Sequence, residues 1–245
     1  MEIRSLSGAD LIDALRSGRR LAQQTRAAST SYALLFTLLG ALIMAPLLML
    51  GFAPFVLAAA GAFMLLGPAV LAGFFGIADA HEAGEAVRFT HALRGFSGAS
   101  PGIWIIALVS VLLFMIFITD AAILYSYMVG RESIHLDELF PLKDGVFRFV
   151  LWGSVSGAFT AFLVYTISAF SVPLLCERRA SMVTAIATSV RAVFGNFALT
   201  MLWAIFLSVL LIGSILLLPL FPFVLPWLAF AGRALYRQTL PLQTK

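Results

Sequence analysis

The sequence predicts an all-α, polytopic membrane protein, and three observations support this prediction. The chain has 245 residues, of which 61% are hydrophobic and only 11% are charged, whereas soluble domains carry about 25% charged residues. Runs of about 20 apolar residues recur along it, long enough to cross about 30 Å of hydrocarbon as helices. Arginine-rich segments separate these runs. We therefore expect lipid to surround much of the protein.

Six apolar runs are expected to form six transmembrane helices, paired in three hairpins. The runs cover residues 32–50, 55–78, 102–128, 146–174, 196–218 and 221–236. Pro68 predicts a kink in the second run, and Pro173 predicts a kink or the exit from the membrane at the end of the fourth. Three clustered prolines divide the last apolar stretch, which would be roughly 52 Å long as a single helix. They are Pro219, Pro222 and Pro226.

Amphipathic helices on the cytoplasmic surface are expected before the hairpins. In the basic N-terminal segment 1–30, Ser7 and Asp10 have the spacing of a capping box. Apolar residues then recur at helical spacing opposite arginines, which predicts a helix in the lipid headgroup layer. The alternative is a helix packed on the protein's own cytoplasmic loops. The same pattern predicts surface helices near 85–96 and 182–197. The six spans define a transmembrane domain over 31–238, followed by a tail over 239–245.

These surface helices suggest an internal repeat of three helix-plus-hairpin units. The segments 12–20, 89–97 and 187–195 align so that Arg16, Arg94 and Arg191 match when the second segment is offset by one residue. Each unit holds two spans, so the copies would insert in the same direction. Arginines here can contact lipid phosphates. The candidate headgroup-binding residues are Arg16, Arg19, Arg20, Arg94, Arg178, Arg179 and Arg191.

The basic residues also predict the orientation. Thirteen lysines and arginines fall on the side of the two termini and of segments 79–101 and 176–195, against three on the other side. Cytoplasmic loops carry the excess of basic residues in membrane proteins. We therefore expect both termini in the cytoplasm. The same asymmetry explains the net charge of +4, so binding of nucleic acid is not expected.

Two stretches carry a resemblance to a known family. Residues 171–178 (SVPLLCER) and 185–191 (AIATSVR) resemble the signature of a family of predicted bacterial integral membrane proteins, domain of unknown function 2189. The resemblance implies a six-span fold and a place in the bacterial inner membrane, and it implies no activity. In that family the third span often carries a basic residue, where this chain has Asp120.

Asp120 is the most distinctive residue inside a predicted span. A carboxylate there costs about 2.5–3.5 kcal/mol to insert, so it is expected to face the bundle interior or a partner subunit. Arg148, early in the fourth span, is the candidate partner, and the alternative is a hydrated Asp120 near the outer interface. Gly153 and Gly157 form a GxxxG sequence, which predicts close helix packing within the bundle or between chains.

Other chemistry is not expected. Haem or copper sites need histidines on facing helices, but His81, His91 and His135 are predicted in loops. Around the first two, Asp79, Glu82 and Glu85 match no tight zinc spacing. We therefore expect no catalytic, cofactor-binding or metal residue.

The sequence thus favours a non-enzymatic protein of the inner membrane. The leading hypothesis is an accessory, assembly or stabilising subunit of a larger membrane complex, for example a respiratory one. Its partners would be a bilayer with anionic headgroups and other integral membrane subunits. The alternative is a transporter of small solutes or lipids with a path through the helical bundle. A third hypothesis is a scaffold that organises lipid through its basic helices.

Overall fold

The computed structural model of the protein describes residues 3–49, 53–130 and 144–241. Of the described residues, 86% lie in helices and none lies in a strand, which confirms the all-α prediction. Within these ranges, four helical segments are long and apolar enough to cross a membrane. They are Pro101–Met128, Gly145–Cys176, Phe197–Ile215 and Leu218–Thr239.

The described residues form ten α-helices and a short 3-10 helix. In chain order they are α1 (Gly8–Gln24), α2 (Arg26–Met49), α3 (Ala53–Glu82), α4 (Phe89–Ser97), α5 (Pro101–Met128), α6 (Asp144–Ser168), α7 (Ser171–Cys176), α8 (Met182–Gly195), α9 (Phe197–Leu216), η2 (Leu218–Leu220) and α10 (Phe221–Thr239). Helix α3 continues through Pro68 and ends four residues later than the predicted span.

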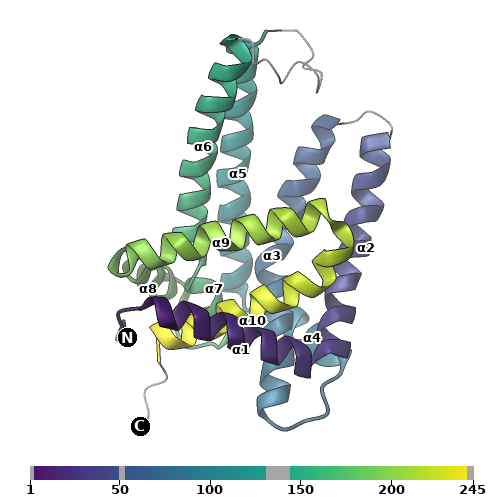
Figure 1. Cartoon of the computed structure of the whole chain (residues 1–245), viewed down its shortest axis with the longest axis vertical. Coiled ribbons are helices and arrows are strands. Elements are labelled where there is room, and N and C mark those ends of the chain that lie inside the picture. Colours follow the sequence, from purple (N-terminus) through teal and green to yellow (C-terminus); the bar gives the residue numbers. More distant parts are fainter. Residues whose placement is uncertain (1–2, 50–52, 131–143, 242–245) are drawn as a thin grey trace.

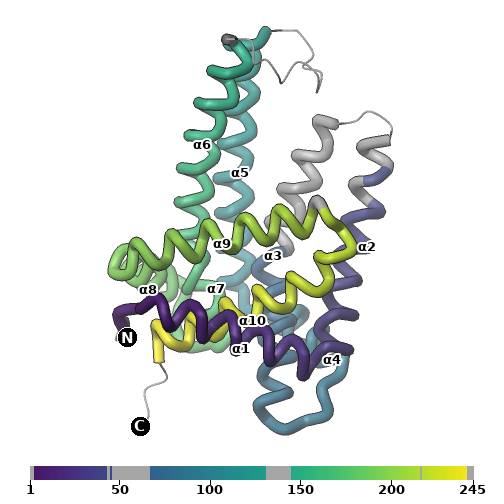
Figure 2. Tube along the Cα trace, viewed as in Figure 1, coloured from purple at the N-terminus to yellow at the C-terminus, as the bar shows by residue number. Residues whose placement is uncertain are grey.

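The three hairpins do not share one direction. Hairpins α2–α3 and α5–α6 stand upright in Figure 1 and are joined by contacts between α3 and α5. The hairpin α9–α10 runs across them, and α1 lies along α10. Figure 2 shows the two termini near each other at the end of the molecule that also holds α4, α7 and α8. We refer to this end as the base.

Helix α1 begins at the predicted cap. The Ser7 hydroxyl accepts a hydrogen bond from the Asp10 N–H at 3.3 Å, and the Asp10 carboxylate accepts one from the Ser7 N–H at 2.7 Å. One side of the helix is then buried against α10. A Cβ on Gly18 would lie 2.4 Å from the backbone nitrogen of Ala231, so only glycine permits this approach.

This packing departs from the expectation of a helix lying in the headgroup layer. The apolar side of α1 faces α10, because α10 returns beside it, and this side is therefore not free to enter lipid. The structure agrees better with the alternative, in which the helix packs on the protein itself. Its packing partner is an apolar helix, however, and not a cytoplasmic loop. The arginines Arg16, Arg19 and Arg20 lie exposed on the other side of α1.

The predicted fourth span is broken before Pro173. Helix α6 ends at Ser168, and α7 starts at Ser171. Ser189 of α8 fills the break, because its hydroxyl accepts from the Phe170 N–H at 3.2 Å and donates to the Thr166 carbonyl at 2.8 Å. Pro173 lies in the first turn of α7, where a missing N–H costs no intrahelical bond. A side chain from another helix therefore stabilises this break.

The proline cluster near the end of the chain forms the predicted turn. Helix α9 stops at Leu216, η2 contains Pro219, and Pro222 is the second residue of α10. Pro226 lies inside α10. This turn reverses the chain and brings the last turns of α10 back to the base.

Candidate functional site

Charged side chains from three elements meet at the base of the molecule. The elements are the end of α3, the turn after α7 and the last turns of α10. The groups contact one another over sequence separations of up to 155 residues. We call them the ion network, and they are Asp79, Glu82, Glu177, Arg179, Arg233, Tyr236 and Arg237.

Arg233 is the centre of this network, and its side chain is only 3% exposed. It donates to Glu82 at 2.7 Å and to the carboxylate of Asp79. Its Nε lies 3.7 Å from Glu177, which is too far for a hydrogen bond and leaves that N–H without an acceptor. The ring of Phe75 lies 5.2 Å from the guanidinium carbon and adds a cation–π contact.

Glu177 connects the turn after α7 to α10. It accepts from Arg237 Nε at 2.8 Å and from the Tyr236 hydroxyl at 3.0 Å. Arg237 also donates to Glu82 at 2.8 Å, so it bridges two carboxylates. Arg179 donates to the Tyr236 hydroxyl at 2.8 Å. Each of these bonds joins segments that are far apart in the sequence.

The ion network is electrically balanced, with three arginines facing three carboxylates. Positions 233, 236 and 237 share one face of α10, and positions 79 and 82 share one face of α3. Because these groups bind one another, the network holds the ends of α3 and α10 and the turn after α7 together. The guanidinium of Arg179 also donates to two backbone carbonyls near the end of α10, at 2.9 Å each. This differs from its expected role at lipid headgroups.

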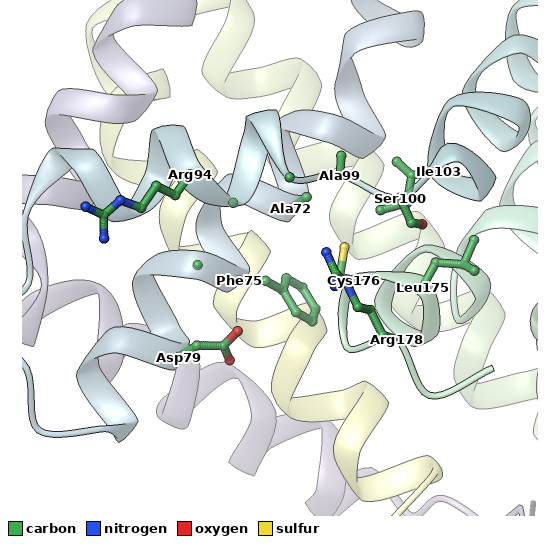
Figure 3. A pocket seen from close by; sticks show the side chains of 13 residues that line it. Ala72, Phe75, Asp79, Arg94, Ala99, Ser100, Ile103, Leu175, Cys176 and Arg178 are labelled. Carbon is green, nitrogen blue, oxygen red and sulfur yellow. The ribbon is translucent and has the colours of Figure 1, made fainter. Parts of the chain in front are cut away.

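A pocket of about 170 Å³ lies beside the ion network, between α3, α4, α5 and α7. Its wall is close-packed on one side, since a Cβ on Gly95 of α4 would lie 2.5 Å from a carbonyl oxygen of α3. Figure 3 shows Arg178 reaching past Phe75 towards Cys176, with Ser100 opposite and Asp79 at the other end. The pocket is therefore lined by arginines, a carboxylate and a hydroxyl group together with small and apolar residues.

A second polar feature lies on the upright hairpin α5–α6. The Ser156 hydroxyl donates to the Asp120 carboxylate at 2.5 Å. The same carboxylate lines a shallow groove formed by α5 residues alone, among them Ile116 and Thr119. The expected partner Arg148 makes no ion pair with Asp120 in the described structure and is exposed. It precedes Ser156 by eight residues on α6, or about 12 Å along the helix.

The GxxxG residues contribute unequally. A Cβ on Gly157 would lie 3.1 Å from the ring of Phe117 on α5, so this glycine faces the partner helix. Gly153 has only Phe149 of its own helix nearby. The contact at Gly157 lies within the chain, and no other helix of the described structure comes within 4 Å of a Cβ at Gly153. Closer helix contacts occur at glycines that the sequence motif did not indicate, such as Gly18.

The remaining candidate arginines lie at the surface. Arg16 is 77% exposed and is 3.8 Å from Asp13. Four further candidates are also exposed, and they are Arg19, Arg20, Arg94 and Arg191. Of these, Arg94 lines the pocket at the last turn of α4. No pattern in the sequence indicates that the charged residues of the ion network contact one another. They lie at positions 79, 82, 177, 233 and 237.

The positions of the histidines match the prediction only in part. His81 lies in the last turn of α3 and not in a loop, whereas His91 lies in α4, which corresponds to the short surface helix predicted within the loop near 85–96. His91 accepts from the Arg88 N–H at 3.1 Å and lies 3.2 Å from Glu85. His135 lies outside the described residues. Over the described ranges, no three histidine, cysteine or acidic side chains group as a metal site would require.

Comparison with known proteins places the chain in a family. The family described as predicted integral membrane protein (DUF2189) matches residues 55–177, about half of the chain. The matched region runs from α3 to Glu177 and includes the Asp120 groove and every lining residue of the pocket except Arg178. Comparison with curated proteins and with solved structures found no match. By this match, the chain belongs to the DUF2189 family of predicted integral membrane proteins.

Proposed function

We propose that the protein is a non-enzymatic subunit of a larger complex in the bacterial inner membrane, which it assembles or stabilises by lateral association. The observation that carries this proposal is the Asp120 groove. Its lining comes from α5 alone, so the carboxylate that accepts a bond from Ser156 of α6 also borders a groove open to the outside of the hairpin. Carboxylates within membrane helices almost always face protein or a water-filled cavity.

The free-energy cost of placing this carboxylate in the membrane favours contact with a partner protein. Inserting it costs about 2.5–3.5 kcal/mol, and one hydrogen bond from Ser156 returns about 1 kcal/mol. A partner helix that supplies a second donor would offset more of the cost. The apolar residues beside Asp120 are highly exposed, with Met115 at 48%, Ile116 at 57% and Ile123 at 63%. We therefore infer that the partner is a transmembrane helix with a polar donor among apolar side chains.

The same proposal includes the topology. We infer that six apolar helices lie in the membrane in three hairpins and that both termini are cytoplasmic. Helix α9 has no charged residue, and only 17% of its most apolar stretch is buried within the protein. Both features support a position in hydrocarbon, even though α9 runs across the other hairpins. The arginine-rich base carries both termini, and an even number of crossings returns the chain to it.

The test is recovery of the complex after mild detergent extraction. We expect the wild-type protein to migrate with partner subunits on native gels, and Asp120→Leu to migrate without them. Leu108→Ala is the matched control, because Leu108 is 62% exposed on the same helix but does not line the groove. A wild-type protein recovered alone in every mild detergent would contradict the proposal.

The transporter alternative rests on the same pair, Asp120 and Ser156, and differs in the access of water that it predicts. A solute path would bring water to Asp120, whereas a docking surface would be dry. Cys176 is the sole cysteine of the chain, so Asp120→Cys can be placed in a Cys176→Ser background. Rapid reaction of this cysteine with a membrane-impermeant thiol reagent would favour transport, and no reaction would favour association.

A further inference from the structure

We infer that the pocket between α3, α4, α5 and α7 binds a phosphate group, supplied either by an anionic phospholipid headgroup or by free phosphate. Three observations on different elements lead to this inference. They concern the side chain of Arg178, the backbone of the same residue, and the hydroxyl of Ser100. The inference does not depend on the association proposed above.

The first observation is the difference between two adjacent arginines. Arg179 belongs to the ion network, with its donors shared among Tyr236 and two carbonyls. Arg178 has no acidic partner and no side-chain hydrogen bond within the described structure, although it lines the pocket. Figure 3 shows its guanidinium inside the pocket, beside Cys176. Five N–H donors are therefore available to an anion.

The second observation is the conformation of Arg178. Its φ is 52°, the single positive value for a non-glycine residue in the described ranges. The N–H groups of Arg178 and Arg179 donate to the carbonyls of Leu175 and Leu174, at 3.2 and 2.9 Å. This is the Schellman pattern at the end of a helix, in which glycine usually occupies the position of Arg178. Because glycine would suit the backbone better, the arginine side chain points to a function of its own.

The third observation is an unused hydroxyl. Ser100 is the N-cap of α5, but its side chain makes no capping bond. Its Oγ is buried, lines the pocket and has no hydrogen-bond partner. Buried hydroxyls are nearly always bonded. The N-terminus of α5 beside it adds partial positive charge, which favours an anion at this point.

The charges around the pocket also favour an anion. Asp79 is the single carboxylate among the lining residues, and its negative charge is paired with buried Arg233. Arg94 lies at the rim, has no ion pair among the described residues, and points outward in Figure 3. Two arginines without acidic partners thus border the pocket.

The size of the pocket limits the ligand. Pockets for whole organic ligands measure about 300–1,000 Å³, whereas this one measures about 170 Å³. It suits a phosphate with a few waters, while the glycerol and acyl chains of a phospholipid would remain outside. The pocket lies at the arginine-rich base, which our topology places at the inner headgroup layer.

The test measures binding to the full-length protein in neutral detergent. The probes are dioctanoyl phosphatidylglycerol, dioctanoyl phosphatidylcholine and inorganic phosphate, followed by native mass spectrometry and thermal shift. We expect phosphatidylglycerol or phosphate to bind and to raise Tm. Arg178→Gln should weaken binding by about tenfold or more, since it removes a charge-assisted contact. Arg191→Gln is the matched control, because Arg191 is exposed on α8 and does not line the pocket.

Arg178→Gly separates binding from folding. Glycine relieves the positive φ, so this variant should fold at least as well as wild type and still lose binding. Ser100→Ala should weaken binding several-fold. Binding of phosphatidylglycerol alone identifies a lipid site, and binding of phosphate alone identifies a solute site. The inference is overturned if neither probe binds, if Arg178→Gly binds like wild type, or if phosphatidylcholine binds equally well.

Discussion

The ion network and the Asp120–Ser156 pair place charge in an apolar helical protein in two different ways. In the ion network, three arginines and three carboxylates from α3, α10 and the turn after α7 compensate one another. On the α5–α6 hairpin, one carboxylate has one neutral donor. The first arrangement is complete within the chain. The second is incomplete, and we attribute the difference to folding at the base and association on the hairpin.

The packing around the two features follows the same division. At the base, α1 lies on α10 with no space for a side chain at Gly18, and α4 lies equally close on α3. In α5, by contrast, only 22% of the most apolar stretch is buried within the protein. Substitutions at the base should therefore change stability, whereas substitutions in the groove should change partners.

The largest expected effect is at Arg233. Arg233→Met removes the buried cation that pairs with Asp79 and Glu82, whose side chains are 59% and 47% exposed. Because water reaches both carboxylates, we expect a loss near the lower end of the about 3–5 kcal/mol that breaking a fully buried ion pair costs. We expect a large loss of monodisperse protein and a lower Tm in detergent. Arg237→Gln is the control, because Arg237 is 31% exposed and its loss should cost about 1 kcal/mol. Equal effects of the two variants would contradict the central place of Arg233.

The next effect is at the contact between α1 and α10. Gly18→Leu forces a side chain into the backbone at Ala231, and overpacking of this kind costs about 1–3 kcal/mol. We expect a lower Tm and faster proteolysis within the N-terminal residues. Gly8→Ala is the matched control, because a Cβ at Gly8 meets nothing within 4 Å. If Gly18→Leu were as stable as Gly8→Ala, α1 would not be held on α10 as described.

A smaller effect on stability is expected at Asp120. Asp120→Leu removes one hydrogen bond, worth about 1 kcal/mol, together with the cost of a carboxylate in lipid. These contributions oppose each other, so Tm should change little or rise. Thermal unfolding in detergent is the measurement, and Ser156→Ala, which leaves the carboxylate without its donor, is the comparison. A loss of stability as large as that of Arg233→Met would place Asp120 in the core of the fold.

The sequence predicted features that depend on near neighbours. The capping pair Ser7 and Asp10, the helix over 182–195 and the turn at Pro219 each follow from residues a few positions apart. The ion network does not, because Asp79 and Arg233 are 154 positions apart and each resembles an ordinary charge at the end of an apolar run. Arg178 and Arg179 are indistinguishable in the sequence. In the structure, the turn after α7 places Arg179 in the ion network and Arg178 at the pocket.

The direction of the third hairpin was likewise not predictable from composition. Helix α9 is as apolar as the upright helices. Its direction depends on the junction of α8 and α9, where Asn196 Oδ1 accepts a hydrogen bond from the Leu6 N–H at 2.6 Å. This contact joins positions 190 residues apart and leaves no periodic signal in the sequence.

The smallest expected effect concerns the cap of α1 and its dependence on pH. The hydrogen bonds with Ser7 hold the pKa of Asp10 below its ordinary value of 3.8. A carboxyl group with a lowered pKa in the fold stabilises the fold fully above its ordinary pKa, and this contribution is lost as pH falls through the folded value. Wild type should therefore exceed Asp10→Asn in Tm at pH 7, and the difference should shrink as pH falls below 3.8.

Ser7→Ala should lower stability by about 1 kcal/mol, as expected for the loss of an N-cap. In this variant the pH-dependent difference on adding Asp10→Asn should be reduced, because the hydroxyl that stabilises the carboxylate is gone. Thermal unfolding of the four proteins at pH 7 and near pH 3.5 completes the double-mutant cycle. A Tm difference between wild type and Asp10→Asn that grew as the pH fell would reverse the sign argued above. The charge of Asp10 would then oppose the cap instead of completing it.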